Sequence, residues 1–225
     1  MAWSDWVRGV EVEPSLYGAD FARLGDQIDE LLAAGCRIFH FDVGDGHFVE
    51  PITMGPIVLQ SISPRIHAAG GRIDVHLMVE RPAKYFDAVA KAGGDSVTFH
   101  IEAVDDVPAT IRAARATGLG VGVAFNPETE PEEVAPVAAE ADLVLCMSIH
   151  PGYSGQAFRE ETYDRLLRLG RLIPSNQLIQ VDGGVGAANI VSLEEHGAAL
   201  LVAASSIFND PDPSAAYTRL AEAIA

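Results

Sequence analysis

The sequence predicts an α/β protein with the (β/α)₈ architecture of a TIM barrel, formed by residues 1–225 as one domain. Three observations support this prediction. Short apolar runs rich in β-branched residues alternate with longer amphipathic segments along the chain, and eight such pairs can be counted. The length of 225 residues fits one barrel. No linker-like, low-complexity or charged segment interrupts the alternation.

The expected elements follow one another in regular order. The eight strands are predicted at residues 10–16, 37–43, 72–78, 96–101, 120–125, 143–149, 178–181 and 200–204. Helices should follow each strand, for example at 20–34 and 82–92, where apolar residues recur at helical spacing, with the last at 212–225. Acidic residues 128–133 should open the fifth helix, because negative charge complements a helix N-terminus.

An open, doubly wound sheet is the rival fold. That fold usually carries a glycine-rich phosphate turn after its first strand. Residues 14–18 read Pro-Ser-Leu-Tyr-Gly at this position and do not match such a turn. The sequence therefore favours the barrel.

The composition restricts the partners and the compartment. With 15 basic and 32 acidic residues the net charge is -17, which disfavours nucleic acid and anionic lipid surfaces. The N-terminus lacks a basic stretch followed by an apolar run, and no segment approaches the apolar length of a membrane span. We therefore expect a soluble, cytoplasmic protein. Cys36 and Cys146 lie in apolar runs without CxxC spacing, which indicates buried free thiols.

Polar residues recur at the ends of the predicted strands, where barrels of this kind carry their chemistry. They are Ser15, His40, Asp42, Asp74, His76, His100, Glu102, Asn126, His150 and Asp182. His40 and Asp42 lie two apart in a strand, so both should face the barrel interior. Together with His76 and Asp182 they form a set of two imidazoles and two carboxylates suited to Zn²⁺, Mn²⁺ or Fe²⁺. Hydrogen-bonded core histidines are the alternative interpretation.

Two further segments are typical of a phosphate-binding site. Residues 181–186, Val-Asp-Gly-Gly-Val-Gly, and 202–206, Val-Ala-Ala-Ser-Ser, are rich in small residues that let backbone N–H groups approach a phosphate. Two ordinary glycine turns are the alternative. Residues 151–156 carry Tyr153 among glycines, which suits a loop that folds over a substrate or an ordinary surface loop.

In combination these segments resemble the ribulose-phosphate 3-epimerase family, and the similarity runs from residue 13 to residue 208. The matching segments are PSL (14–16), ADFARL (19–24), HFDV (40–43), DGHFV (45–49), DVHLM (74–78), FHIEA (99–103), NPET (126–129), MS (147–148), PG (151–152), GQ (155–156) and VDGGV (181–185). So many segments in one order make the resemblance specific.

The resemblance implies a barrel of the ribulose-phosphate-binding type and one divalent cation, which is zinc, iron, manganese or cobalt. It implies that His40, Asp42, His76 and Asp182 bind this cation and that Asp42 and Asp182 are the catalytic acid and base. The implied substrate contacts are Ser15, His76, Met78, Met147, Gly152, Tyr153, Ser154, Gly155, Gly183, Gly184, Ala204 and Ser205. The implied partners are a small sugar phosphate and, since family members commonly self-associate, further copies of the chain.

The implied reaction is epimerisation at C3 of a ketose phosphate, with D-ribulose 5-phosphate and D-xylulose 5-phosphate as the first choice. A proton on carbon next to a ketone is weakly acidic, and a cation holding the carbonyl oxygen would stabilise the enediolate formed when it leaves. Asp42 and Asp182, on opposite faces of that plane, would exchange the roles of base and acid. No nicotinamide or flavin is needed.

The sequence departs from the family pattern at Gly44, Glu50, Pro51, His150, Ser154 and Ala204. Gly44 stands where the family generally has a methionine and removes side-chain volume beside the expected intermediate, and His150 adds a hydrogen-bond donor, which could admit a longer or differently substituted sugar. These two changes leave open a C3-epimerase for another ketose phosphate, such as D-allulose 6-phosphate. Ser154 and Ala204 leave open a non-catalytic sugar-phosphate-binding relative. Decarboxylases on related barrels are disfavoured, because Lys84 and Lys91 are the only lysines and neither lies at a strand end.

Overall fold

The computed structural model describes residues 3, 6–7, 9–153 and 155–224, in which strands and helices alternate. The strands are β1 (Glu11–Pro14), β2 (Ile38–Gly44), β3 (Arg72–Met78), β4 (Ser96–His100), β5 (Gly120–Phe125), β6 (Leu143–Met147), β7 (Leu178–Asp182) and β8 (Leu200–Ala203). The α-helices are α1 (Leu24–Ala33), α2 (Pro56–Ala68), α3 (Phe86–Lys91), α4 (Val107–Ala116), α5 (Pro131–Ala138), α6 (Glu161–Leu172), α7 (Ile190–Glu195), α8 (Ser205–Phe208) and α9 (Pro213–Ala223). Short 3₁₀ turns are η2 (Leu16–Gly18), η3 (Pro82–Lys84) and η4 (Ile101–Ala103).

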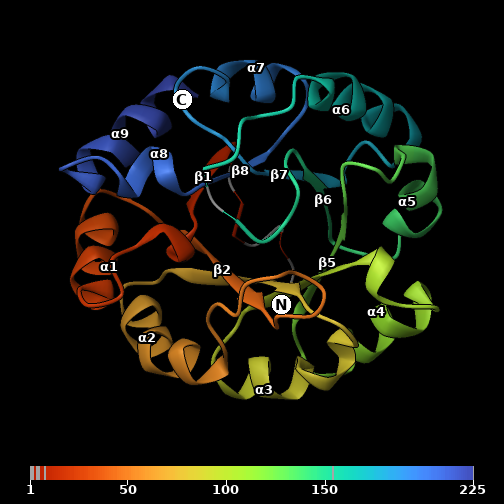
Figure 1. The fold of residues 1–225 in the computed structure, drawn as a ribbon, viewed down its shortest axis with the longest axis horizontal. Helices are drawn as coiled ribbons and strands as arrows, with labels where there is room; N and C mark the ends of the chain where they lie inside the picture. Colours follow the sequence, from red (N-terminus) through yellow and green to blue (C-terminus); the bar gives the residue numbers. More distant parts are fainter. Residues whose placement is uncertain (1–2, 4–5, 8, 154, 225) are drawn as a thin grey trace.

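The strands run parallel in one sheet with the order β1-β8-β7-β6-β5-β4-β3-β2. β1 and β2 stand at the two ends of this order, and a parallel bridge between Ser15 and His40 joins them. The sheet therefore curves back on itself. Figure 1 shows the strands at the centre of a ring of helices. The predicted (β/α)₈ barrel is confirmed.

The predicted strands are present. β3 and β5 have the predicted boundaries, and the boundaries of the other strands differ by one to a few residues. β1 ends at Pro14 instead of residue 16, because the turn η2 begins at Leu16. β4 and β6 end before the predicted positions 101 and 149. β7 extends one residue further than predicted and includes Asp182 as its last residue.

Several helices also differ from the prediction. α1 begins at Leu24 instead of residue 20, because Asp20 Oδ1 accepts a hydrogen bond from the Ala22 N–H and holds a turn there. The predicted helix at 82–92 divides into η3 and α3. The fifth helix opens as expected with acidic residues, and the side chain of Glu133 accepts a hydrogen bond from the Glu130 N–H. α9 ends at residue 223, and residue 225 of the predicted last helix lies outside the described residues.

The apolar core has two parts because strand side chains alternate between the two faces of the sheet. Phe39 and Phe41 of β2 point outward and belong to the large cluster between the sheet and the helices. Ile38 of the same strand points inward and packs in a smaller cluster inside the barrel. His40 and Asp42 share the inward face with Ile38, as the strand period predicts, and both are buried.

Trp3 and Trp6 cover the amino end of the barrel. Trp3 and Trp6 are buried, and their ring centroids lie 4.6 Å apart. Both pack with Leu143 and Leu200, the first residues of β6 and β8. A Cβ added to Gly120 would lie 3.1 Å from the Trp3 ring, so a glycine at this position lets the indole approach the strand. The carboxyl end of the barrel is left for a functional site.

Cys36 and Cys146 are buried and free, as the sequence predicted. Within the described ranges, every helix is too short or too polar to cross a bilayer.

Arg165 of α6 is a buried cation that fixes two strand ends. Its guanidinium donates hydrogen bonds to the carbonyl oxygens of Met147 at 2.8 Å, Asn126 at 2.7 Å and Thr129 at 3.0 Å. It also lies over the Phe125 ring, 4.7 Å from the centroid. Because the ends of β5 and β6 border the carboxyl face, this residue stabilises the wall of that face.

We expect Arg165→Met to reduce the free energy of unfolding by about 3 kcal/mol, because it leaves buried carbonyl oxygens without donors. Chemical denaturation measures this change. The matched control is Arg168→Met on the same helix, where the side chain forms exposed ion pairs with Glu130 and Glu132. That variant should unfold close to wild type. Equal midpoints for the two variants would contradict the structural role of Arg165.

Candidate active site

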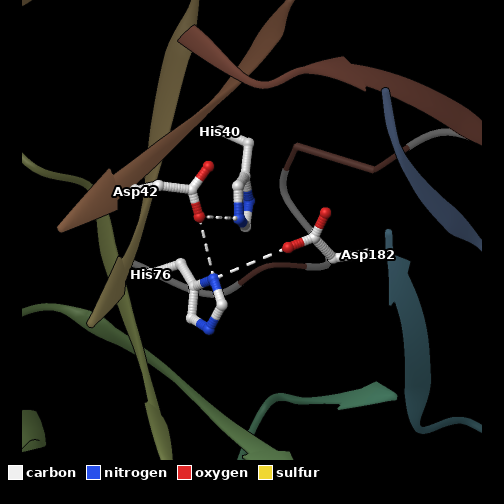
Figure 2. Close-up of side chains that lie close together, drawn as sticks. All are labelled: His40, Asp42, His76 and Asp182. Carbon is white, nitrogen blue, oxygen red and sulfur yellow. Dashed lines mark hydrogen bonds and ion pairs between the residues drawn. The ribbon is translucent and has the colours of Figure 1, made fainter. Parts of the chain in front are cut away.

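Four side chains converge inside the carboxyl end of the barrel. His40 and Asp42 come from β2, His76 from β3 and Asp182 from the end of β7. One ligand atom from each of the four lies within 4.8 Å of the others. Figure 2 shows the two carboxylates and the two imidazoles turned toward one another. Two residues that are 140 positions apart in the chain, Asp42 and Asp182, thus share one site.

The distances show which nitrogen of each histidine faces the shared space. His76 Nδ1 lies 2.9 Å from Asp42 Oδ1 and 3.8 Å from Asp182 Oδ2. His40 Nε2 lies 3.3 Å from Asp42 Oδ1. The other ring nitrogens, His40 Nδ1 and His76 Nε2, face away from the two aspartates and toward further buried residues.

Strand register explains why these residues meet. β2 and β3 pair so that Asp42 lies beside His76, and His40 lies beside Asp74 two residues earlier. Side chains two apart on a strand share a face, so both pairs point into the barrel. The site is therefore built from two layers, an upper one with the two aspartates and a lower one around Asp74.

The residues of the lower layer contact the His40 ring on its Nδ1 side, away from Asp42. His40 Nδ1 lies 3.1 Å from Asp74 Oδ2 and 3.8 Å from Glu13 Oε2, and all three side chains are fully buried. Gln180 of β7 donates hydrogen bonds to Glu13 at 2.5 Å and to Asp74 at 3.0 Å, and Ser96 donates to Asp74 at 2.7 Å. Burial raises the pKa of Glu13 to about 7. These contacts fix the orientation of the His40 ring.

The donor set fits a divalent cation. His40 Nε2 is buried and has no hydrogen-bond partner among the described residues, although it points at the Asp42 carboxylate. Burial lowers the pKa of His40, but the Asp42, Asp74 and Glu13 carboxyl groups outweigh this effect and raise it well above its usual range. The surroundings of this nitrogen therefore favour positive charge, and two imidazoles with two carboxylates are ligands that Zn²⁺, Mn²⁺ and Fe²⁺ accept.

The two aspartates differ in their protonation. Burial would raise the pKa of Asp42, but His40 and His76 hold it well below its usual range. Ser15 Oγ also donates a 2.6 Å hydrogen bond to Asp42 Oδ2. Burial, together with the nearby charge of Asp42, raises the pKa of Asp182 to about 7. Asp42 is thus held ionised while Asp182 can carry a proton near neutral pH, so the two carboxyl groups differ in protonation state, as a pair for acid–base chemistry does.

A cavity opens above the aspartates, with about 490 Å³ of empty space that includes its opening to solvent. It is lined by Ser15, Tyr17, Asp42, Met78, Met147, Ile149, Pro151, Gly152, Tyr153, Gly155, Asp182, Gly183, Gly184, Val185, Val202, Ala204 and Ser205. No lysine or arginine is among these described residues, so an anion in the cavity would depend on backbone N–H groups and hydroxyls.

The structure brings most of the predicted substrate residues to this cavity. Ser15, Met78, Met147, Gly152, Tyr153, Gly155, Gly183, Gly184, Ala204 and Ser205 line it. His76 was also predicted to contact the substrate, but it is fully buried beside Asp42 and is not part of the lining. Ser154 lies outside the described residues.

Five lining residues were not among the predicted substrate contacts, and they are Tyr17, Ile149, Pro151, Val185 and Val202. Pro151, Val185 and Val202 lie in the segments 151–156, 181–186 and 202–206 that the sequence assigned to a ligand, whereas no motif distinguishes Ile149 from a core residue. Tyr17 had a usable signal, because it is an amphipathic side chain two residues after Ser15 in the turn that follows the first strand.

The loops after β7 and β8 present small residues for steric reasons. Gly183 has a φ of 117° and Gly184 a φ of 63°, which disfavour other residues. A Cβ at Gly183 would lie 2.3 Å from the Ile149 side chain, and one at Gly184 would lie 3.0 Å from the Phe158 nitrogen. These glycines therefore form a tight turn and also line the cavity. The glycine-turn interpretation of residues 181–186 is thus compatible with the phosphate-site interpretation.

The loops after β2 and β6 touch above the barrel. Tyr153 Oη donates a 2.9 Å hydrogen bond to Glu50 Oε2. Gly152 packs closely on the same loop, since a Cβ there would lie 3.1 Å from Val49 and 3.3 Å from Pro51. Tyr153 and Gly152 line the cavity. The contact holds the β6 loop beside the cavity, as expected of a loop that covers a ligand.

Gly44 and His150, two of the departures from the family pattern, do not shape the cavity as the sequence suggested. A Cβ at Gly44 would lie 2.8 Å from the Pro51 oxygen and 3.0 Å from Val49, so neighbouring residues already fill the space that Gly44 was expected to open. The His150 side chain is 61% exposed and lies 3.3 Å from Glu128 Oε1. Neither residue belongs to the cavity lining among the described residues. The hypothesis that they admit a longer sugar is therefore not supported.

Comparisons with known proteins agree with this geometry. The model of the family described as "Ribulose-phosphate 3 epimerase family" matches residues 11–208. The chain is 40% identical to "Ribulose-phosphate 3-epimerase" of Escherichia coli (strain K12), over 89% of this chain and 90% of that protein. It is 36% identical to "Ribulose-phosphate 3-epimerase" of Bacillus subtilis (strain 168), over 94% of this chain and 98% of that protein.

Solved structures share the fold at low sequence identity. The 3-hexulose-6-phosphate synthase of Salmonella typhimurium has a TM-score of 0.72 at 15% identity, covering 95% of this chain and 98% of that one. KGPDC from Streptococcus mutans has a TM-score of 0.72 at 12% identity, covering 96% of this chain and 98% of that one. At these identities the likeness extends to the barrel alone.

Proposed function

The chain belongs to the ribulose-phosphate 3-epimerase family and is an epimerase of a pentose phosphate, and from this premise we propose that it interconverts D-ribulose 5-phosphate and D-xylulose 5-phosphate. The observation that carries the proposal is the convergence of Asp42 and Asp182 with two imidazoles beneath a cavity open to solvent. Inversion at a carbon needs one group to remove a proton from one face and another to return one to the opposite face. Two carboxylates from β2 and β7, which lie three strands apart around the barrel, would supply such a pair.

Asp42 and Asp182 would transfer the protons. In one direction the ionised Asp42 carboxylate accepts the proton from C3, and Asp182, whose pKa is raised to about 7, donates a proton to the opposite face. In the other direction the roles are exchanged. The hydroxyl of Ser15, which donates to Asp42 Oδ2 at 2.6 Å, holds the carboxylate in place while Oδ1 faces His76.

His40, Asp42, His76 and Asp182 would hold one divalent cation, which we propose to be zinc, iron, manganese or cobalt. Such an ion, when bound, supplies positive charge that stabilises the negative charge developing on the substrate oxygens. The unpartnered His40 Nε2 and the excess of carboxylates around it support this assignment.

The cavity residues would position the sugar. Met78 and Met147 lie at the ends of β3 and β6, where apolar side chains exclude water from a planar intermediate. The phosphate would lie against the small residues Gly183, Gly184 and Ser205, since backbone N–H groups and a hydroxyl are the donors available there. Tyr153 would cover the bound sugar from the β6 loop.

We expect the protein to prefer D-ribulose 5-phosphate when it is given a panel with D-allulose 6-phosphate and unphosphorylated D-ribulose. Binding energy from the remote phosphate helps to position C3, so the free sugar should have a kcat/KM lower by about 10²-fold or more. Steady-state rates on the three sugars measure this preference. A higher kcat/KM on D-allulose 6-phosphate would reassign the substrate, and equal turnover of the free sugar would refute the phosphate site.

A further inference from the structure

His100, the last residue of β4, lies directly behind the candidate ligand His76. The two Nε2 atoms are 2.8 Å apart, and the rings are inclined by only 24° with centroids 5.0 Å apart. Both side chains are fully buried, and the Phe48 ring packs on His100 with a centroid distance of 4.8 Å. A distance of 2.8 Å between two ring nitrogens requires a proton between them, so this is a hydrogen bond whose direction depends on the tautomers.

Without a cation, His76 Nδ1 lies at hydrogen-bond distance from Asp42 Oδ1, and a cation bound at this nitrogen would fix the direction of the bond to His100. His76 Nδ1 faces Asp42 and Asp182, at 2.9 Å and 3.8 Å, and is the nitrogen available to a cation. A neutral imidazole that binds a cation through Nδ1 must carry its proton on Nε2. His76 Nε2–H then donates to His100 Nε2, and the proton of His100 must lie on Nδ1.

Glu102 stands where the Nδ1 proton of His100 would point. His100 Nδ1 has no hydrogen-bond partner within the described part of the chain, and it faces Glu102 Oε2 at 3.5 Å. The other carboxylate oxygen, Oε1, already accepts hydrogen bonds from the Asn126 N–H at 2.7 Å and the Thr129 hydroxyl at 2.5 Å. The carboxylate is therefore fixed from one side, and its free oxygen is directed at His100.

We propose that His100, oriented by Glu102, is a positioning residue that sets the tautomer and the ring orientation of His76 for cation binding. This inference rests on the proposed metal-dependent function. The two histidines of the site are then held differently, because His40 has the carboxylate of Asp74 directly behind it while His76 has a second imidazole. Outer contacts of this kind contribute substantially to cation affinity.

Removing the acceptor should weaken cation binding without removing a ligand. We expect His100→Ala to raise the dissociation constant for Co²⁺ by about 10- to 100-fold. His100→Gln keeps an acceptor oxygen near His76 Nε2 and should recover part of the loss. Glu102→Gln preserves shape but weakens the hold on the His100 proton, so it should lose affinity several-fold.

The test is a Co²⁺ titration of metal-free protein, followed by visible absorption and by competition with a chelator. The matched control is His67→Ala, which removes another histidine hydrogen-bonded to a carboxylate, 2.8 Å from Asp95 and outside the site. Denaturation midpoints of the metal-free variants separate loss of the fold from loss of the site. A weaker Co²⁺ affinity and an altered spectrum in His100→Ala, with His67→Ala like wild type, are the expected results.

Co²⁺ affinity and spectra within about twofold of wild type in His100→Ala would overturn the inference and leave the proposed function standing. If that variant does not fold, the same criterion applies to Glu102→Gln. Wild-type protein that does not bind Co²⁺ would overturn both the metal-dependent function and the inference that rests on it.

Discussion

Replacing Asp42 or Asp182 with asparagine should reduce kcat for D-ribulose 5-phosphate by about 10³-fold or more, because each variant loses a base and weakens a cation ligand. Asparagine keeps the size of the side chain, so the cavity should retain its shape. Both substitutions are expected to be severe, since inversion requires a proton transfer on each face. Steady-state assays of D-xylulose 5-phosphate formation measure the effect.

Two controls separate proton transfer from other causes. The cation content of each variant must be measured beside its rate, because Asp42 and Asp182 are also candidate ligands. Asp142→Asn is the matched substitution outside the site, where the carboxylate accepts hydrogen bonds from the Val121 N–H and from Arg115. It should keep wild-type kcat. A cation-loaded Asp42→Asn or Asp182→Asn within about tenfold of wild type would show that the two-base assignment is wrong.

Removal of the cation should abolish epimerisation, and adding back Zn²⁺, Mn²⁺, Fe²⁺ or Co²⁺ should restore it. The affinity should also depend on pH in a defined direction. Burial and Asp42 raise the pKa of Asp182 to about 7, so below pH 7 a proton occupies this carboxylate and competes with the cation. His40 must also lose its proton to bind the cation, and its pKa is raised too, so the affinity should fall by at least about tenfold per pH unit below pH 7.

Chelation, elemental analysis and competition titrations at pH 6 and pH 8 test this prediction. Protein dialysed without chelator is the control and should keep its activity. Full activity in protein that elemental analysis finds free of metal would exclude a required cation. An affinity that rises as the pH falls would contradict the role of Asp182 as a ligand.

Much of the fold and of the aspartate–histidine cluster could be predicted because both follow from the regular spacing of residues along strands and helices. Alternation along β2 places His40 and Asp42 on one face, and the convergence of parallel strand ends brings His76 and Asp182 toward them. The ends of strands and helices were predicted less accurately because local hydrogen bonds decide them. Asp20 holds a turn where a longer helix was expected.

Side-chain direction beyond a strand end could not be predicted, because it depends on contacts between loops that are distant in sequence. His150 was expected beside the substrate, but it pairs with Glu128 on the surface. Gly44 was expected to open space that residues 49–53 fill. His100 and Glu102 were visible as polar residues at the fourth strand end, yet only the register of β3 and β4, which pairs His76 with Thr98, places His100 against His76.

The most direct test of the central claim is the position of deuterium after turnover in D₂O. Wild-type protein is given D-ribulose 5-phosphate, and the isolated D-xylulose 5-phosphate is analysed by proton NMR. If a proton leaves C3 to one carboxylate and another returns from the opposite carboxylate, the product should carry one solvent deuterium at C3 and none elsewhere on the chain. Product that keeps protium at C3, or carries deuterium at C1 instead, would contradict epimerisation by Asp42 and Asp182.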